Sequence, residues 1–101
     1  MKMLLLIFRN SLDQDIRHLL KGLDVKAFTE APKVFGMGDA GHAVNSFHGP
    51  GFNSMILAAM EEDQAETVVK ELRAFRNHRA QLQDGVKIPM RVFLLPCEQA
   101  I

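Results

Sequence analysis

Two short apolar runs limit what this chain can fold into. Residues Met3–Phe8 read MLLLIF and are followed by Arg9 and Asn10, and Phe52–Met60 ends in a similar run. Runs this short that are apolar at every position are typical of strands buried on both faces, whereas helices usually need ten residues or more. We therefore expect two interior strands.

A helical pattern follows each apolar run. Ser11 with Gln14 fits a capping box for a first helix that ends near Gly22, and Asp63 with Glu66 opens a second helix in the same way. Apolar residues then recur every three or four positions, as on one face of a helix. The expected buried residues are Leu12, Ile16, Leu19, Leu20 and Leu23 in the first helix, and Ala65, Val68, Val69, Leu72 and Phe75 in the second.

Two further segments have weaker strand patterns. Val25–Ala31 alternates and is rich in β-branched and aromatic residues, and Val86–Pro96 follows a turn at Asp84 and Gly85. Pro89 cannot donate a hydrogen bond to a neighbouring strand, so the last strand should lie at a sheet edge or contain a bulge.

The resulting order β-α-β-β-α-β predicts an α+β fold, the ferredoxin-like sandwich, as a single domain over residues 1–101. Right-handed crossovers give an antiparallel sheet of order 4-1-3-2, with the strands numbered along the chain. This order places the two apolar runs at the centre and the proline-containing strand at an edge.

The apolar runs also predict self-association. Both helices of this fold cover one face of the sheet, so the open face of a monomer should carry polar residues at alternate positions. Met3–Phe8 and Met55–Met60 have no such alternation. We expect the open face to be covered by further copies in a closed oligomer; the alternative is that the long loop folds over it.

Composition excludes several function classes. Lys plus Arg and Asp plus Glu number 12 each, so no net field favours nucleic acid or an anionic membrane. The single cysteine, Cys97, rules out an intrachain disulfide framework and is expected to be a small buried residue. No apolar segment has the length of a signal peptide or a membrane span. We therefore expect a cytoplasmic protein without membrane insertion.

The segment 32–51 is the candidate functional loop, because it holds five of the seven glycines and loops of about 20 residues are usually functional or disordered. Backbone amides of Gly36, Gly38 and Gly41 can form an anion-binding nest, and Lys87 can supply a cation to the same anion. The alternatives are glycines that only permit turns and an exposed strand lysine without a ligand.

Two histidines of this loop, His42 and His48, suggest a transition-metal site, aided by Met37, although their separation matches no known metal motif. Two exposed, unpaired histidines are the alternative. Asp39 near His42 resembles an acid–base pair, but no nucleophile or second carboxylate accompanies it. We therefore expect no enzymatic activity and assign no catalytic residue.

The order of elements over nearly the whole chain, together with several short motifs, resembles that of the P-II signalling proteins. Val34–His42 (VFGMGDAGH) resembles the start of their long T-loop; Asp84–Ile88 (DGVKI) and Val92–Ile101 (VFLLPCEQAI) resemble their B-loop and last core strand. The departures indicate a divergent branch: there is no tyrosine to modify, the loop is shorter, Arg79–Gln83 lacks the B-loop threonine and glycine, and Val86 is inserted.

The resemblance implies a homotrimer that binds an adenine nucleotide or another small anionic effector in a cleft between subunits. It also implies that the loop then controls a protein partner such as a membrane transporter or an enzyme. The candidate ligand-binding residues are Gly36, Met37, Gly38, Gly41, His42 and Lys87. Two alternatives are a metal-binding protein like the CutA cation-tolerance family, through His42 and His48, and an adaptor that contacts a partner through Phe47 and Phe52.

Overall fold

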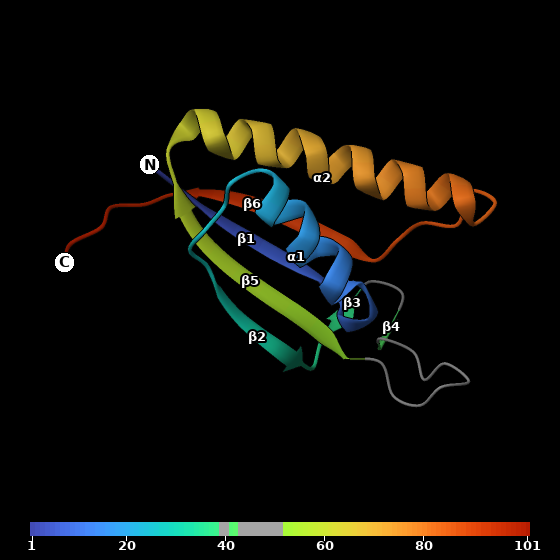
Figure 1. The fold of residues 1–101 in the computed structure, drawn as a ribbon. Helices are drawn as coiled ribbons and strands as arrows, with labels where there is room; N and C mark the ends of the chain where they lie inside the picture. Colours follow the sequence, from blue (N-terminus) through green and yellow to red (C-terminus); the bar gives the residue numbers. More distant parts are fainter. Residues whose placement is uncertain (39–40, 43–51) are drawn as a thin grey trace.

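The computed structural model describes residues 1–38, 41–42 and 52–101 (Figure 1). The elements along the chain are β1 (Lys2–Arg9), the 3-10 turn η1 (Asn10–Leu12), α1 (Asp13–Gly22), β2 (Thr29–Val34), β3 (Met37–Gly38), β4 (Gly41–His42), β5 (Asn53–Met60), α2 (Glu62–Leu82) and β6 (Met90–Pro96).

The main sheet has the strand order β2-β5-β1-β6, and all its neighbouring strands are antiparallel. The two apolar runs form the central strands β1 and β5, and both helices lie on one face of the sheet (Figure 1). The ferredoxin-like α+β fold and the strand order predicted from the sequence are therefore confirmed.

Both predicted helix starts are wrong by one or two residues. Helix α1 begins at Asp13 after a 3-10 turn, and α2 begins at Glu62, with Leu12 and Glu61 as their N-cap residues. Neither N-cap side chain makes a capping hydrogen bond, so the capping residues predicted at Ser11 and Asp63 do not fill that role.

The two edge strands are displaced from their predicted bounds. The strand predicted at 25–31 is β2 at 29–34, and the strand predicted at 86–96 begins only at Met90, after Pro89. Val25 and Ile88 are buried but lie outside any strand. Both side chains fill the core from irregular segments. They are therefore as hydrophobic as buried strand residues, which explains why the sequence predicted strands there.

The core lies between the sheet and the two helices, and alternate residues of the central strands enter it. Leu4, Leu6, Phe8 and Ile56 are 0–1 % exposed. On the other face, β1 and β5 residues such as Leu5 and Leu57 are half-buried, and the β6 residues are exposed. We call this other face the open face. Its apolar residues are Met3, Leu5, Ile7, Met55, Leu57, Ala59, Phe93 and Leu95.

The open face is a continuous apolar surface in the single chain. Leu5 lies opposite Leu57 on one side and Phe93 on the other, so a row of large side chains crosses three strands. Phe93 and Leu95 are 46 % and 45 % exposed. A contiguous apolar patch of this kind usually marks a surface of association.

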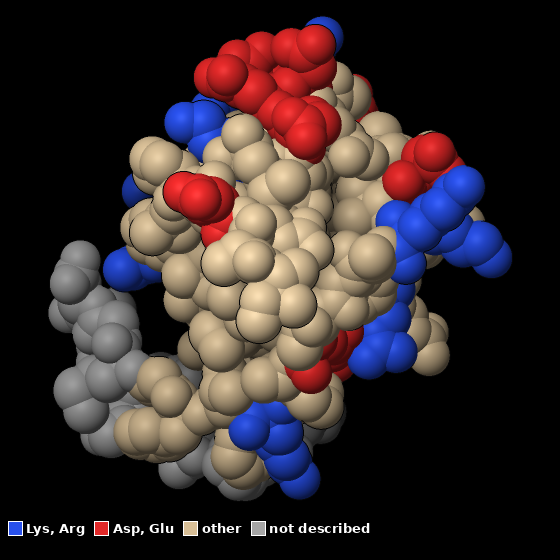
Figure 2. All heavy atoms as spheres, turned by 90° about the vertical axis from the view of Figure 1, so that its left-hand side faces the viewer, with Lys and Arg blue, Asp and Glu red and all other residues tan. Residues whose placement is uncertain are grey.

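Charge is unevenly spread along α2. Acidic side chains gather where α2 begins, at the top of Figure 2, and come from Glu61, Glu62, Asp63 and Glu66, all exposed. Basic residues occupy its later turns, as the helix dipole favours. Within the described residues, no helix has the combination of length and hydrophobicity needed to cross a bilayer.

Asp24 occupies a position that usually belongs to glycine. Its φ is 63°, and the amides of Asp24 and Val25 donate to the carbonyls of Lys21 and Leu20, which is a Schellman ending for α1. A side chain in this left-handed conformation costs about 1 kcal/mol.

We expect Asp24→Gly to raise the free energy of unfolding by about 0.5–1 kcal/mol, because glycine adopts positive φ without steric cost. Asp24→Ala should change stability in the opposite direction, since alanine lacks the local hydrogen bonds that help aspartate in this conformation. Urea unfolding of both variants measures the two effects. A stability loss in the glycine variant would contradict the assignment.

Candidate functional site

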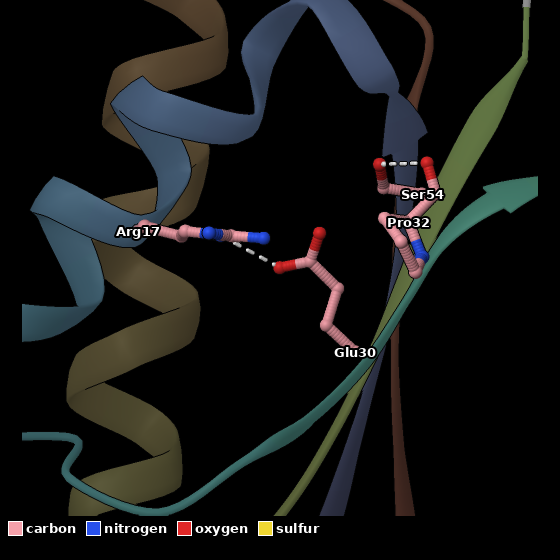
Figure 3. A network of polar contacts seen from close by, with 4 residues as sticks. All are labelled: Arg17, Glu30, Pro32 and Ser54. Carbon is pink, nitrogen blue, oxygen red and sulfur yellow. Dashed lines mark hydrogen bonds and ion pairs between the residues drawn. The ribbon is translucent and has the colours of Figure 1, made fainter.

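The base of the 32–51 loop is built from the ends of β2 and β5. Ala31 pairs with Met55 and Val34 with Asn53, so β2 advances three residues where β5 advances two, and the extra residue forms a bulge. Pro32 lies in this bulge, where its missing N–H is tolerated. The buried Ser54 hydroxyl donates to the Pro32 carbonyl oxygen at 3.3 Å (Figure 3).

Phe52 is fixed at the other side of the loop base. Its carbonyl oxygen accepts a hydrogen bond from the Asn10 amide at 3.0 Å, and the Lys33 ammonium lies 5.1 Å from its ring centroid. This cation–π contact joins the end of β2 to the residue before β5. Phe52 is only partly exposed, which does not favour its predicted role as an adaptor contact; Phe47 lies outside the described residues.

A polar cluster lies beneath this base, between α1 and β2. The Arg17 Nε donates to Glu30 Oε1 at 2.9 Å, and the Glu30 side chain is only 7 % exposed (Figure 3). The second oxygen of Glu30 and Oδ1 of Asp13 are both buried without a hydrogen-bond partner in the described structure.

The two carboxyl groups have opposite pKa shifts. Burial is the main cause that raises the pKa of Asp13; the nearby Ser54 hydroxyl opposes the rise, and the proximity of Glu30 adds to it. The hydrogen bond from Arg17 is the main cause that lowers the pKa of Glu30, and the contact with Asp13 adds to it. These opposite shifts make Asp13 easier to protonate, and Glu30 harder to protonate, than the same groups in an unfolded chain.

The sequence pattern does not predict this cluster. The sequence places Asp13 and Arg17 on the polar side of a helix and Glu30 in a weak strand. Only the packing of α1 against β2 brings the three side chains together. The one usable signal is the single acidic residue within the predicted strand 25–31, which needs a partner if it is buried.

Five of the predicted ligand-binding residues follow β2 in the chain, between Gly36 and His42. Met37 pairs with His42 and Gly38 with Gly41, so β3 and β4 form a short hairpin within the segment predicted to be irregular. A Cβ added to Gly36 would lie 2.9 Å from the Asn53 side-chain nitrogen, and Gly36 does not have positive φ. A close neighbour therefore restricts this position.

Lys87, the sixth predicted residue, does not meet the other five within one chain. It is exposed in the segment between α2 and β6, outside the strand in which it was predicted. Arg9 pairs with Asn53 and Phe8 with Met90, so Lys87 and the loop base belong to the same end of the sheet. However, β2 and β6 are opposite edges, about 14 Å apart at three strand spacings.

The metal and catalytic hypotheses gain no support from the described residues. That part of the chain has no group of three or more His, Cys, Asp or Glu side chains arranged to hold a metal ion. His42 lies in β4, whereas His48 and Asp39 lie outside the described residues. Cys97, predicted to be buried, is partly exposed after β6.

Comparison with protein families matches residues 1–101 to the family described as "Nitrogen regulatory protein P-II". The chain belongs to this P-II family, a family of regulatory proteins, and the resemblance seen in its short motifs is confirmed. Comparison with curated protein sequences gives no match.

Solved structures with the same fold include two proteins that are similar to this chain. The first is CPII, a nitrogen regulatory PII-like protein from Thiomonas intermedia K12 bound to ADP, AMP and bicarbonate, with a TM-score of 0.69, 21% identity, and coverage of 93% of this chain and 82% of that one. The second is a DUF3240 family protein from Shewanella baltica OS155, with a TM-score of 0.65, 20% identity, and coverage of 97% and 90%.

Proposed function

We propose that this chain is a P-II-like signal transduction protein that assembles as a homotrimer. It binds a small effector in the cleft between subunits and controls a protein partner through the 32–51 loop. One observation carries this proposal. Residues 36–42 and Lys87, the two halves of the predicted site, belong to the same end of the sheet but to its opposite edges.

This separation favours a site shared by two copies. In a closed ring of subunits, the β2 edge of one copy faces the β6 edge of the next. The glycine-rich hairpin would then lie beside the partner's segment before β6, which carries Lys87. Backbone amides and a lysine ammonium together suit an anionic ligand.

The open face supports the assembly itself. Three copies that turn this face inward would bury the row formed by Leu5, Leu57 and Phe93 in each chain. Burial of apolar area stabilises association by about 25 cal/mol per Å². The same face leaves the helices and the loops on the outside, where a partner can reach them.

An adenine nucleotide is the effector we propose first, because the similar CPII structure is bound to ADP, AMP and bicarbonate. The B-loop-like segment of this chain is altered, so bicarbonate or another small anion is the alternative ligand of the same cleft. A membrane transporter or an enzyme is the proposed partner, and the proposed location is the cytoplasm.

We expect isothermal titration calorimetry to detect binding of at least one of ATP, ADP, AMP and bicarbonate, with one site per chain. Lys87→Gln should weaken that binding about tenfold, because it removes the cation that faces the anion. Hydrogen exchange across residues 32–51 should slow when the effector binds.

Lys26→Gln is the matched control, since Lys26 is an exposed lysine whose only described contact is a surface ion pair with Asp24 at 3.5 Å. It should bind the effector as the unmodified protein does. If none of the four compounds bound, or if Lys26→Gln and Lys87→Gln weakened binding equally, the proposed effector site would be rejected.

A further inference from the structure

A second candidate ligand site lies away from the loop, in a groove of about 400 Å³ between the later turns of α2 and the edge strand β6. Its apolar lining includes Leu72 from the helix and Met90 and Val92 from the strand. Arg73 and Arg76 from α2 and Arg91 from β6 also line it. The groove thus combines an apolar lining with guanidinium groups.

Two of the three arginines of α2, Arg73 and Arg76, line the same groove. Arg73 and Arg76 are three residues apart, and residues at this spacing are neighbours on a helix surface. Both are exposed, so their charged ends remain able to reach a ligand.

Among the described residues, neither Arg73 nor Arg76 forms an ion pair with an acidic side chain. The residues three and four positions away from Arg76 are Leu72, Arg73, Arg79 and Ala80, and those around Arg73 include no Asp or Glu. Arg79, one turn later, differs: it pairs with Asp15 of α1 and stacks on Phe75.

We propose that this groove binds a small amphipathic anion, that is, a phosphate or carboxylate group attached to an apolar body. Arg73 and Arg76 bind the anionic group, because guanidinium groups match carboxylate and phosphate oxygens in a planar, bidentate geometry. The apolar body lies against Val69 and Val92, which line the groove and are partly exposed. The volume is within the range of small-molecule sites in proteins.

This site is independent of the proposed effector cleft. Its lining includes neither the hairpin of β3 and β4 nor Lys87. Arg73 and Arg76 repel each other across one helix turn, and no acidic side chain three or four residues away on α2 reduces this repulsion. An anion bound in the groove would reduce it.

The test is a titration of the full chain with phenyl phosphate, followed by two-dimensional NMR of the backbone amides. Inorganic phosphate serves as the anion without the apolar body, and phenol as the body without the anion. We expect saturable shifts at residues 69–76 and 90–93 with phenyl phosphate, and at least about tenfold weaker binding of either fragment.

The double variant Arg73→Gln/Arg76→Gln should weaken phenyl phosphate binding at least about tenfold. The control Lys21→Gln/Lys70→Gln removes the same amount of charge from exposed positions outside the groove and should leave the affinity within about twofold. Unfolding curves confirm that both double variants fold.

Three results would overturn the proposal: no saturable shift in the groove, equal weakening in both double variants, or equal binding of phenyl phosphate and inorganic phosphate. Shifts confined to residues 36–42 and 84–88 would also overturn it and would instead place the anion in the effector cleft. Lys87→Gln separates the two proposals, because it should leave binding in the groove unchanged.

Discussion

Leu57→Asp is expected to convert the proposed trimer into single chains. Leu57 lies at the middle of the open face, opposite Leu5. Loss of one buried leucine costs about 2 kcal/mol per chain, and an unpaired buried carboxylate costs several kcal/mol more. Summed over three chains, the leucine contribution alone lowers the association constant by about 10⁴. Sedimentation velocity would show a shift from three times the 11.3 kDa chain mass to one.

Leu82→Asp provides the matched control for this prediction. Leu82 is 68 % exposed at the end of α2, so the same substitution there does not touch the open face. This variant should sediment like the unmodified protein, and circular dichroism should show that both variants keep their helices. An unmodified chain that is already monomeric at micromolar concentration would contradict the trimer, and the intersubunit effector site with it.

Glu30→Gln is expected to lower the free energy of unfolding by about 2 kcal/mol at neutral pH. The change removes the charge-assisted hydrogen bond from Arg17, a class of bond that contributes about 1.5–3 kcal/mol. The Arg17 side chain is 54 % exposed, so solvent screening places the effect in the lower part of this range. Urea unfolding at several pH values measures it.

The pH dependence of this effect follows from the direction of the pKa shift. The pKa of Glu30 is lower in the folded chain than its ordinary value of 4.5, so the folded state binds this proton less tightly than the unfolded state. Its stabilisation is therefore present above pH 4.5 and is lost as the pH falls through the folded pKa. The difference between Glu30→Gln and the unmodified protein should disappear in that acid range.

Asp13→Asn should have the opposite effect. The pKa of Asp13 is raised from its ordinary value of 3.8, so its contribution favours folding in acid and is lost as the pH rises through the folded pKa. An asparagine amide can donate to the buried Glu30 oxygen without taking up a proton. We expect a gain of about 1 kcal/mol at neutral pH.

Glu66→Gln is the control for both carboxyl variants, because Glu66 is exposed on α2 and should show little effect at any pH. If Glu30→Gln and Asp13→Asn gave the same sign at neutral pH, or if neither depended on pH, the opposite pKa shifts of the two carboxyl groups would be contradicted. The base of the loop would then be fixed by the Ser54 and Phe52 contacts alone.

The centre of the sheet could be predicted from the sequence because an unbroken apolar run is a local signal. Met3–Phe8 and the run ending at Met60 are too short for helices and too apolar for edge strands, so their place in the sheet followed directly. Edge strands were harder to place. Val25 and Ile88 are buried from irregular segments, and a side chain that fills the core from a turn has the same hydrophobicity as one in a strand.

The glycines of the loop and the regular helical spacing were likewise visible in the sequence, and so was the family to which the chain belongs. The contact of Arg17 with Glu30, the unpartnered oxygens of Asp13 and Glu30, and the groove beneath Arg73 and Arg76 were decided only by the tertiary structure. Each depends on where a helix packs against a strand distant in sequence. Local periodicity specifies which residues are apolar, but only packing specifies which charged residues meet.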